Sequence, residues 1–392
     1  MENQSPPRRH SLLWTLLRPL VILITKIKFN YHTKPFKASG SHFVVANHNC
    51  EWDPVFIITT FRRQVYFVTS EHILRKGAVS RFLIWGQDPI GRQKGGSAAG
   101  TVKAILRRLR SGGSVCLYPE GNRSWDGVTA PFPPATGKLA RASGSPLVTF
   151  RARGSYLANP RWADNAVHRG RVDGEVVGVY PPETLRAMTN EEVNALIARD
   201  LYVDAYADQE PIPQRFRGKN LAEHLETLLF ICPKCGEAHA MHSHGDRFFC
   251  AQCGYEVTME DTGFFSGEDV IFKTVRHWRT WQDEKITALC AETPPGYPIF
   301  RDDSMELWSV DFGRSAEKIS SGELALYIDK IVLPGGEEIK ISQLSGISLR
   351  GPQDMYLGDG GRSFLVRSDD IKCTVKYLTA CVALGMADEY GV

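Results

Sequence analysis

Two short polar segments, each directly after an apolar run, carry the residues best suited to chemistry. The first, Asn47-His48-Asn49-Cys50-Glu51-Trp52-Asp53-Pro54, follows Phe43 to Ala46, and the second, Tyr118-Pro119-Glu120-Gly121-Asn122-Arg123-Ser124, follows Ser114 to Leu117. A histidine that an aspartate orients and charges is a general base, able to take a proton from an alcohol as it attacks a carbonyl. Glycine permits close backbone approach, and arginine can clamp a phosphate. Together the segments indicate acyl transfer onto a phosphorylated alcohol.

The spacing of His48 and Asp53 requires the chain to turn between them. Five positions on a regular helix correspond to about 500° of rotation, so the two side chains would not share a helix face. Aspartate before proline favours a helix start, with Asp53 at the cap and Pro54 in the first turn. A structural interpretation stays open, in which Asp53 is only a cap and His48 only a strand-end histidine. The segment from Glu120 to Arg123 would then be a loop with a surface ion pair.

Other residues near these segments bear on the chemistry. Arg92, in Ile90-Gly91-Arg92, is a further candidate for binding phosphate. The stretch from Gly95 to Thr101 approaches a phosphate loop but has Gly100-Thr101 where Gly-Lys-Ser/Thr is required, which excludes nucleotide hydrolysis. Cys50 lies two residues from His48, so a covalent acyl-cysteine intermediate is an alternative to direct transfer.

Residues 29 to about 206 alternate apolar runs with helical stretches, which indicates an α/β domain. These stretches are His42–Ala46, Pro54–Phe61, Val65–Thr69, Ala98–Arg110, Val115–Tyr118, Gly137–Ala142 and Pro146–Phe150. The hydrophobic fraction of 43% and the charged fraction of 23% are those of an ordinary globular protein, which argues against wholesale disorder and against many membrane spans. A proline-bearing polar stretch from Asp208 to Lys219 marks the end of this domain.

A basic and apolar leader precedes this domain. Residues 1 to 40 hold seven basic side chains and one acid, and the apolar run from Ser11 to Thr25 is interrupted by Arg18-Pro19. Because a membrane span takes about 20 apolar residues, we expect an interfacial helix with Trp14 and the leucines embedded and the cations facing anionic headgroups. A buried core helix is the alternative, while the interruption and the lack of a clear cleavage site argue against a signal peptide. We therefore expect a peripheral protein on the cytoplasmic face of the cell membrane.

Four of the nine cysteines form two knuckles, Cys232-Pro-Lys-Cys235-Gly and Cys250-Ala-Gln-Cys253-Gly. Two such knuckles present four thiolates to one tetrahedral zinc, which we interpret as structural because no coordination position stays open. Two disulfides are unfavoured in a chain without a secretion signal, and an iron centre of rubredoxin type is chemically possible. His239, His242 and His244 lie between the knuckles and could replace a ligand. No catalytic cofactor is expected.

Beyond about residue 264 the pattern changes to short β-type runs with turns, followed by an apolar helical stretch from Thr374 to Leu384. This order of elements resembles a pleckstrin-homology-like or GRAM-like barrel. A helix from Leu221 to Leu229 is predicted to lead into the zinc ribbon. The expected organisation is an amphipathic leader (1–28), an α/β domain that carries the two segments for acyl transfer (29–215), a linker helix with a zinc ribbon (216–262) and a β-rich domain (263–392).

Three blocks of this sequence resemble those of the 1-acylglycerol-3-phosphate acyltransferase family. They are Asn47-His48-x4-Asp53-Pro54, Pro119-Glu120-Gly121-x-Arg123-Ser124-x-Asp126-Gly127 and Pro146-Leu147-Val148-Thr149-Phe150. The resemblance covers roughly residues 10 to 205. It implies direct transfer of a fatty acyl group from a thioester to the free hydroxyl of lysophosphatidic acid, which forms phosphatidic acid. It also implies that His48 is the base and Asp53 orients it, and that Arg92, Glu120, Gly121 and Arg123 bind the glycerol phosphate.

The resemblance leaves several partners open. The donor is either acyl-coenzyme A or acyl carrier protein, and the acceptor is lysophosphatidic acid or another lysolipid. A protein of a different class, a non-catalytic lipid-binding or regulatory protein, would keep the fold as a docking surface. Such a surface would not need the full set of base, orienting acid and phosphate clamp. Nucleic acid is not expected as a partner, because the ribbon holds few basic residues, Lys234 and Arg247, among acids and histidines.

Overall fold

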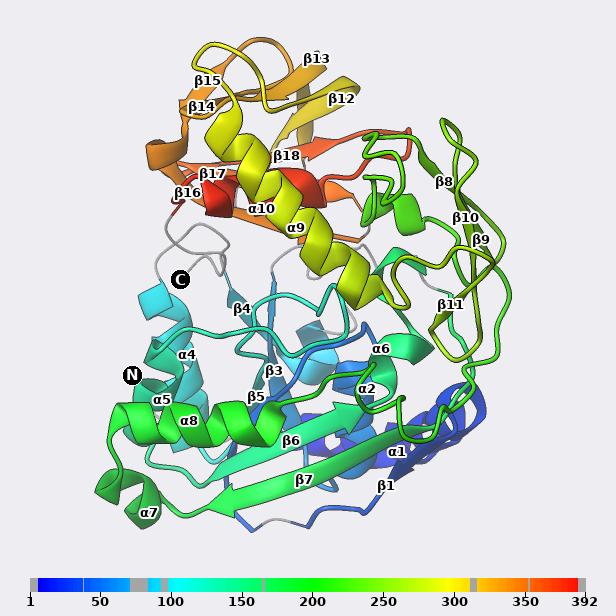
Figure 1. Ribbon diagram of the computed structural model, residues 1–392. Coiled ribbons are helices and arrows are strands. Elements are labelled where there is room, and N and C mark those ends of the chain that lie inside the picture. The colour runs from blue at the N-terminus through cyan, green and yellow to red at the C-terminus, as the bar shows by residue number, and fades with distance from the viewer. Residues whose placement is uncertain are drawn as a thin grey trace. The chain divides into compact units, whose positions relative to one another are not determined.

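The chain folds as two compact units (Figure 1). The computed structural model describes residues 6–37, 39–70, 84–92, 98–163, 166–310, 316–351 and 353–386. The first unit comprises Met1–Pro160 and Val167–Arg217, and the second comprises Arg161–Ala166 and Gly218–Val392. The finer division into four segments stays a prediction.

A seven-stranded sheet with the order β1-β7-β6-β2-β5-β3-β4 forms the centre of the first unit. All neighbouring strands run parallel except β6 and β7. Strand β2 is buried at every position, which explains its continuous apolar sequence. The strands are β1 (Tyr31–Thr33), β2 (Phe43–Ala46), β3 (Val65–Ser70), β4 (Ile90–Arg92), β5 (Ser114–Leu117), β6 (Leu147–Arg153) and β7 (Val172–Tyr180).

The helices of this unit bury apolar residues against the sheet. Leu109 of α4, Leu139 of α5 and Ile197 of α8 join Phe43 and Val115 in one core cluster. The described helices here, besides α1, are α2 (Asp53–Thr60), α4 (Ala98–Arg110), α5 (Ala135–Ala142), α6 (Ser155–Ala158), α7 (Pro182–Ala187) and α8 (Asn190–Leu201). The α/β architecture that the alternating pattern predicts is thus present, and the two polar segments follow the adjacent strands β2 and β5.

Helix α1 (Arg8–Phe29) has one buried face and one exposed apolar face. Trp14 is buried and its indole N–H donates to the Phe61 carbonyl at 3.1 Å, while Arg18 donates to the Thr59 carbonyl at 2.7 Å. The expectation that Trp14 and Arg18 face a membrane is therefore wrong, because both contact the domain. The opposite face exposes Leu12, Leu16, Leu20, Leu23 and Ile27. Among the described helices, none has the length and hydropathy needed to cross a bilayer.

The cysteine-rich part of the second unit contains a small antiparallel sheet of β8 (Met241–His244), β9 (Arg247–Cys250), β10 (Glu256–Met259) and β11 (Phe265–Ser266). The predicted helix from Leu221 to Leu229 is wrong, since only a short 3-10 turn, Leu225–Thr227, forms there. The reason lies in the backbone. His224 has a φ of 67°, and the N–H groups of Leu221 and His224 donate to side chains of the neighbouring hairpin, Asp246 and Ser243.

The C-terminal part of the second unit is β-rich, as predicted. Its seven-stranded antiparallel sheet has the order β15-β14-β13-β12-β18-β17-β16. Its likeness to a pleckstrin-homology barrel stays a prediction. The strands and helices are α9 (Val275–Glu292), β12 (Phe300–Ser309), β13 (Glu317–Leu326), β14 (Lys330–Val332), β15 (Glu338–Lys340), β16 (Leu344–Arg350), β17 (Asp354–Asp359), β18 (Arg362–Arg367) and α10 (Val375–Ala383).

Candidate active site

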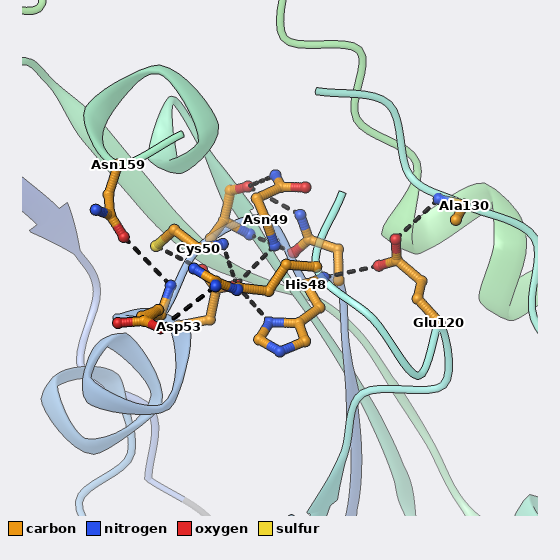
Figure 2. Close-up of polar contacts among 11 residues, drawn as sticks. His48, Asn49, Cys50, Asp53, Glu120, Ala130 and Asn159 are labelled. Carbon is orange, nitrogen blue, oxygen red and sulfur yellow. Dashed lines mark hydrogen bonds and ion pairs between the residues drawn. The ribbon is translucent and has the colours of Figure 1, made fainter. Parts of the chain in front are cut away.

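The loop between β2 and α2 brings His48 and Asp53 into contact (Figure 2). His48 Nδ1 lies 2.9 Å from Asp53 Oδ2, and the imidazole is about one-fifth exposed (21%) while the carboxylate is buried. Because a carboxylate only accepts at this contact, Nδ1 carries the proton and donates it to Asp53. The remaining ring nitrogen, Nε2, is then left with a lone pair. This is the tautomer that a general base needs.

Asp53 is held by the loop rather than by the helix that it begins. Its Oδ2 also accepts the backbone N–H groups of Asn49 at 2.7 Å and Cys50 at 2.9 Å. The N-cap position of α2 is Trp52, which makes no side-chain cap. The expectation that Asp53 caps α2 is therefore wrong, since its carboxylate turns back toward the loop. The same turn directs the carboxylate at His48.

Cys50 supports the aspartate instead of presenting a nucleophile. The thiol is fully buried and donates to Asp53 Oδ1 at 3.4 Å. Burial, together with the negative charge of Asp53, raises the pKa of Cys50 well above its ordinary value. A thiolate is disfavoured there, so the acyl-cysteine alternative lacks its reactive species.

The second polar segment is tied to the first through main-chain atoms. Glu120 Oε1 accepts the His48 N–H at 2.7 Å, and Oε2 accepts the Ala130 N–H at 2.8 Å (Figure 2). The Ser124 N–H donates to the His48 carbonyl at 2.8 Å. The Tyr118 ring stacks on the imidazole with centroids 4.4 Å apart. The segment that follows β5 thus contacts the backbone N–H, the backbone carbonyl and the ring of His48.

Glu120 is the most deeply buried carboxyl group at this site, with no exposed surface. Burial raises its pKa to about 8, against the opposing effect of the two N–H donors. Both of its oxygens face main-chain groups, so in this structure it positions the His48 backbone. Its predicted contact with a bound acceptor stays a prediction.

Arg123 lies beside the loop that carries His48. Its guanidinium is 3.3 Å from the carboxylate of Glu51, and the arginine side chain is largely buried. Gly121, with a φ of 71°, makes the turn between Glu120 and Arg123, a conformation that glycine adopts without strain. Arg92 is the last residue of β4, where it pairs with Ser70 of β3, but its side chain is outside the described part of the chain.

Two asparagines, for which the sequence indicated no role, anchor this loop. The Asn47 side chain donates to the Ala152 carbonyl at 3.0 Å and accepts the Ala152 N–H at 2.8 Å, as a strand neighbour would. Asn159 Oδ1 accepts the Glu51 N–H at 3.4 Å. Asn47 directly precedes the histidine, which is a usable signal. Nothing in the local sequence connects Asn159 to a loop more than a hundred residues earlier.

The four knuckle cysteines of the second unit converge on one point, and all their sulfurs lie within 4.8 Å of one another. The Cys232–Cys253 and Cys235–Cys250 sulfur pairs are 3.6 and 3.8 Å apart. A tetrahedron with metal–sulfur bonds of about 2.3 Å has edges of about 3.8 Å, whereas a disulfide measures about 2.05 Å. The disulfide alternative is therefore wrong, and the cluster fits a metal such as zinc.

Histidine is not required at this metal site. His239 Nε2 accepts a hydrogen bond from Lys376 Nζ at 3.2 Å, so it is engaged elsewhere. Among the described residues, the group of side chains placed to hold a metal consists of the four cysteines alone. Gly236 and Gly254, with φ values of 75° and 72°, close the two knuckles.

Comparison with known proteins places the first unit in a class. Residues 28–153 match the family model described as Acyltransferase. The first unit therefore contains an acyltransferase domain. The match agrees with the predicted resemblance to the 1-acylglycerol-3-phosphate acyltransferase family, as do the relatives described next. A second family model, described as Ribosomal protein S27a, matches residues 221–259, which include all four knuckle cysteines.

Two relatives carry the name 1-acyl-sn-glycerol-3-phosphate acyltransferase. One, from Borreliella burgdorferi, is 27% identical over 120 residues, which are 30% of this chain and 48% of the relative. The other, the chloroplastic BAT2 of Brassica napus, is 24% identical over 129 residues, 33% of this chain and 37% of the relative. The chain thus spans less than half the length of either relative.

A solved structure is also similar, that of the 1-acyl-sn-glycerophosphate (LPA) acyltransferase PlsC from Thermotoga maritima. It is 17% identical, with a TM-score of 0.39, and the match covers 48% of this chain and 79% of that one.

Proposed function

We propose that this protein transfers a fatty acyl group from an acyl thioester to the free hydroxyl of lysophosphatidic acid, forming phosphatidic acid. The observation that carries the proposal is the contact of His48 Nδ1 with Asp53 Oδ2 at 2.9 Å, in a loop whose Glu51 lies 3.3 Å from the Arg123 guanidinium. A base, its orienting carboxylate and a phosphate-binding cation together suit this reaction. The named relatives support the same acceptor.

In the proposed mechanism, His48 Nε2 takes the hydroxyl proton as the acceptor oxygen attacks the thioester carbonyl. The carbon–oxygen bond forms, the carbon–sulfur bond breaks, and the proton passes from Nε2 to the departing thiolate. Asp53 stabilises the imidazolium that exists between these steps. No acyl-enzyme forms, which agrees with the burial of the Cys50 thiol.

The acceptor phosphate is assigned to Arg123, with Gly121 allowing close approach of the backbone and Arg92 as an additional cation. A guanidinium binds phosphate through paired hydrogen bonds, so it fixes the glycerol hydroxyl relative to the base. The donor is acyl-coenzyme A or acyl carrier protein. A head group other than a bare phosphate, as in another lysolipid, is the alternative acceptor.

We further propose that the protein binds the cytoplasmic face of the cell membrane as a peripheral protein. The exposed stripe of α1, with Leu16 at 72% and Leu12 at 62% exposure, is apolar, and basic residues flank it at both ends of the helix. Such a helix lies in an anionic interface with its apolar face among the acyl chains. The lipid substrates would then be presented in the same layer.

In the second unit, the cysteine cluster is proposed to hold a structural zinc ion in a zinc ribbon. The sulfur spacing and the S27a match support this assignment. A redox-inactive metal that four thiolates enclose has no open position for substrate. The β-rich part is proposed to be a pleckstrin-homology-like module that assists docking to the membrane or a partner.

The test is turnover by the purified full chain with lysophosphatidic acid and, separately, acyl-coenzyme A and acyl carrier protein as donors. We expect diacyl product from the wild type and none from His48→Ala. His32→Ala is the matched control, since His32 is half-buried on the edge strand β1 of the same unit and hydrogen-bonds to Asn30. Turnover that survives in His48→Ala would rule out the mechanism. A wild type that binds lysolipid without converting it would support a lipid-binding protein.

A further inference from the structure

Arg123, the proposed phosphate clamp, faces a carboxylate of the protein itself. Glu51 lies three residues after His48, and one of its carboxylate oxygens is 3.3 Å from the Arg123 guanidinium. The arginine side chain is 13% exposed and the glutamate side chain 50% exposed. Within this ion pair, the Glu51 carboxylate is therefore accessible to solvent, while the Arg123 guanidinium is largely buried.

The backbone of Glu51 is fixed even though its side chain is half exposed. Its N–H donates to Asn159 Oδ1 at 3.4 Å, and the loop around it is tied to Asp53 through the N–H groups of Asn49 and Cys50 (Figure 2). A carboxylate oxygen makes the same charge-assisted contact with a guanidinium as a phosphate oxygen does. Any acceptor that reaches Arg123 therefore meets the Glu51 carboxylate beside it.

We propose that Glu51 determines which acceptor head group the site binds preferentially. A bare phosphomonoester has a charge of about −1.5 to −2 at pH 7 and must displace or repel the Glu51 carboxylate. A phosphate that carries an ammonium group, as in an ethanolamine lysophospholipid, places its anion on Arg123 and its cation on Glu51. Glu51 thus weakens binding of lysophosphatidic acid and strengthens binding of a zwitterionic lysolipid. This inference rests on the proposed function, because it takes Arg123 as the phosphate clamp.

The substitution Glu51→Gln should affect binding of the two kinds of acceptor in opposite directions. It removes the charge and keeps the size, so the KM for lysophosphatidic acid should fall and the KM for the ethanolamine lysolipid should rise. Each change is expected to be about two- to fivefold, the range of a half-exposed ion pair. Values of kcat should change less, since the His48–Asp53 pair is untouched. A Glu51 that served only to hold the loop would instead raise both KM values.

Glu175→Gln is the matched control. Glu175 on β7 pairs with Arg151 on β6, with exposures of 52% and 17%, close to those of the Glu51–Arg123 pair. Because this pair joins β6 to β7 rather than the two polar loops, and the substitution removes the same charge, Glu175→Gln should leave both KM values unchanged. If it shifts them as Glu51→Gln does, the effect is one of overall charge and the inference is wrong.

Direct binding separates failure of this inference from failure of the proposed function. Glycerol 3-phosphate and glycerophosphoethanolamine are titrated into the full chain by calorimetry, which needs no turnover. Arg123→Gln should weaken binding of both probes. If it weakens neither, the phosphate clamp and the inference both fail. If it weakens both but Glu51→Gln shifts the two affinities in the same direction, only the assignment of Glu51 is overturned.

Discussion

At the scale of single residues, the carboxylate of Asp53 is predicted to have a large effect on activity. It fixes the Nδ1–H tautomer of His48 and accepts the N–H groups of Asn49 and Cys50. Asp53→Asn presents an amide that neither holds this tautomer nor stabilises an imidazolium. We expect kcat to fall by about 10²- to 10⁴-fold, the range of general-base and triad variants. Steady-state turnover measures this.

The control for this substitution is Asp173→Asn, which removes an exposed carboxylate paired with Arg171 in the same unit. It should retain wild-type kcat. A value of kcat for Asp53→Asn close to that of the control would mean that His48 does not act through Asp53.

The raised pKa of Glu120 predicts how the stability of the folded chain depends on pH. Its pKa in the folded chain, about 8, lies above the ordinary value of 4.5 because the carboxyl is buried. The group therefore favours the folded state below about pH 4.5, and this contribution is lost as the pH rises toward 8. Glu120→Gln cannot titrate, so the unfolding midpoint of the wild type should fall relative to this variant between pH 5 and 8.

Urea unfolding at several pH values measures this difference, because all other titrating groups are common to both proteins. A difference that stays constant with pH would show that the N–H groups of His48 and Ala130 keep the carboxylate ionised. A difference that grows in favour of the wild type with rising pH would contradict the prediction outright.

Residue types and spacing could predict which side chains take part in this site, but not all of their contacts. The pairing of His48 with Asp53 joins two residues of one short loop, so a local pattern was sufficient to predict it, although the expected cap at Asp53 does not form. The contacts of Glu120 with the His48 and Ala130 N–H groups are made by main-chain atoms, which carry no residue signature. The contact of Glu51 with Arg123 depends on how two loops on adjacent strands approach each other.

At the scale of elements, we predict that membrane binding depends on the exposed apolar face of helix α1 and that folding depends on its buried face. Leu16, Leu20 and Leu23 are exposed at 72%, 56% and 55%, whereas Trp14 is buried at 2%. The triple variant Leu16→Gln, Leu20→Gln, Leu23→Gln should lose binding to anionic vesicles and keep its unfolding midpoint. Trp14→Ala should instead lower stability by about 3–5 kcal/mol, as large-to-small core substitutions do.

Vesicle sedimentation and urea unfolding of both variants check this pair of outcomes. Undiminished vesicle binding by the triple variant would exclude the α1 stripe as the membrane contact. A loss of stability in that variant as large as in Trp14→Ala would mean that the stripe is covered by protein.

Helices and strands with a clear hydrophobic pattern could be predicted from the sequence. Those whose position depends on side chains distant in sequence could not. Parallel strands such as β2 are continuous apolar runs, and α4 was predicted with the bounds that it has. Helix α9 was missed, because its 18 residues bury five side chains among many polar ones. Its position depends on Gln282, which accepts the Phe230 N–H at 2.8 Å and donates to the Leu228 carbonyl at 3.0 Å. The bond to the Leu228 carbonyl adds to the contacts of Leu221 and His224 that keep Leu221 to Leu229 from forming a helix.

At the scale of the whole molecule, the cysteine cluster, with the metal proposed for it, and the β-rich part of the second unit are expected to unfold together. The segment that leads into Cys232 is held by α9, since Trp278 donates to the Ile231 carbonyl at 3.0 Å. The segment after Cys235 is held by α10, since the buried Lys376 Nζ bridges His239 Nε2 at 3.2 Å and Asp302 Oδ2 at 2.7 Å. A cluster that loses its metal would release both segments at once.

Removal of the metal is therefore predicted to lower the stability of the second unit and to leave that of the first unit unchanged. Structural zinc contributes about 10–16 kcal/mol to small metal-dependent domains, more than a short four-stranded sheet can replace. With a chelator, or in Cys232→Ser, the calorimetric transition that contains the second unit should move to lower temperature. The transition of the acyltransferase domain should stay, because its core cluster is formed by residues of the first unit alone. Metal analysis should give one ion per wild-type chain. A single transition that shifts as a whole on chelation would show that the two units do not fold independently.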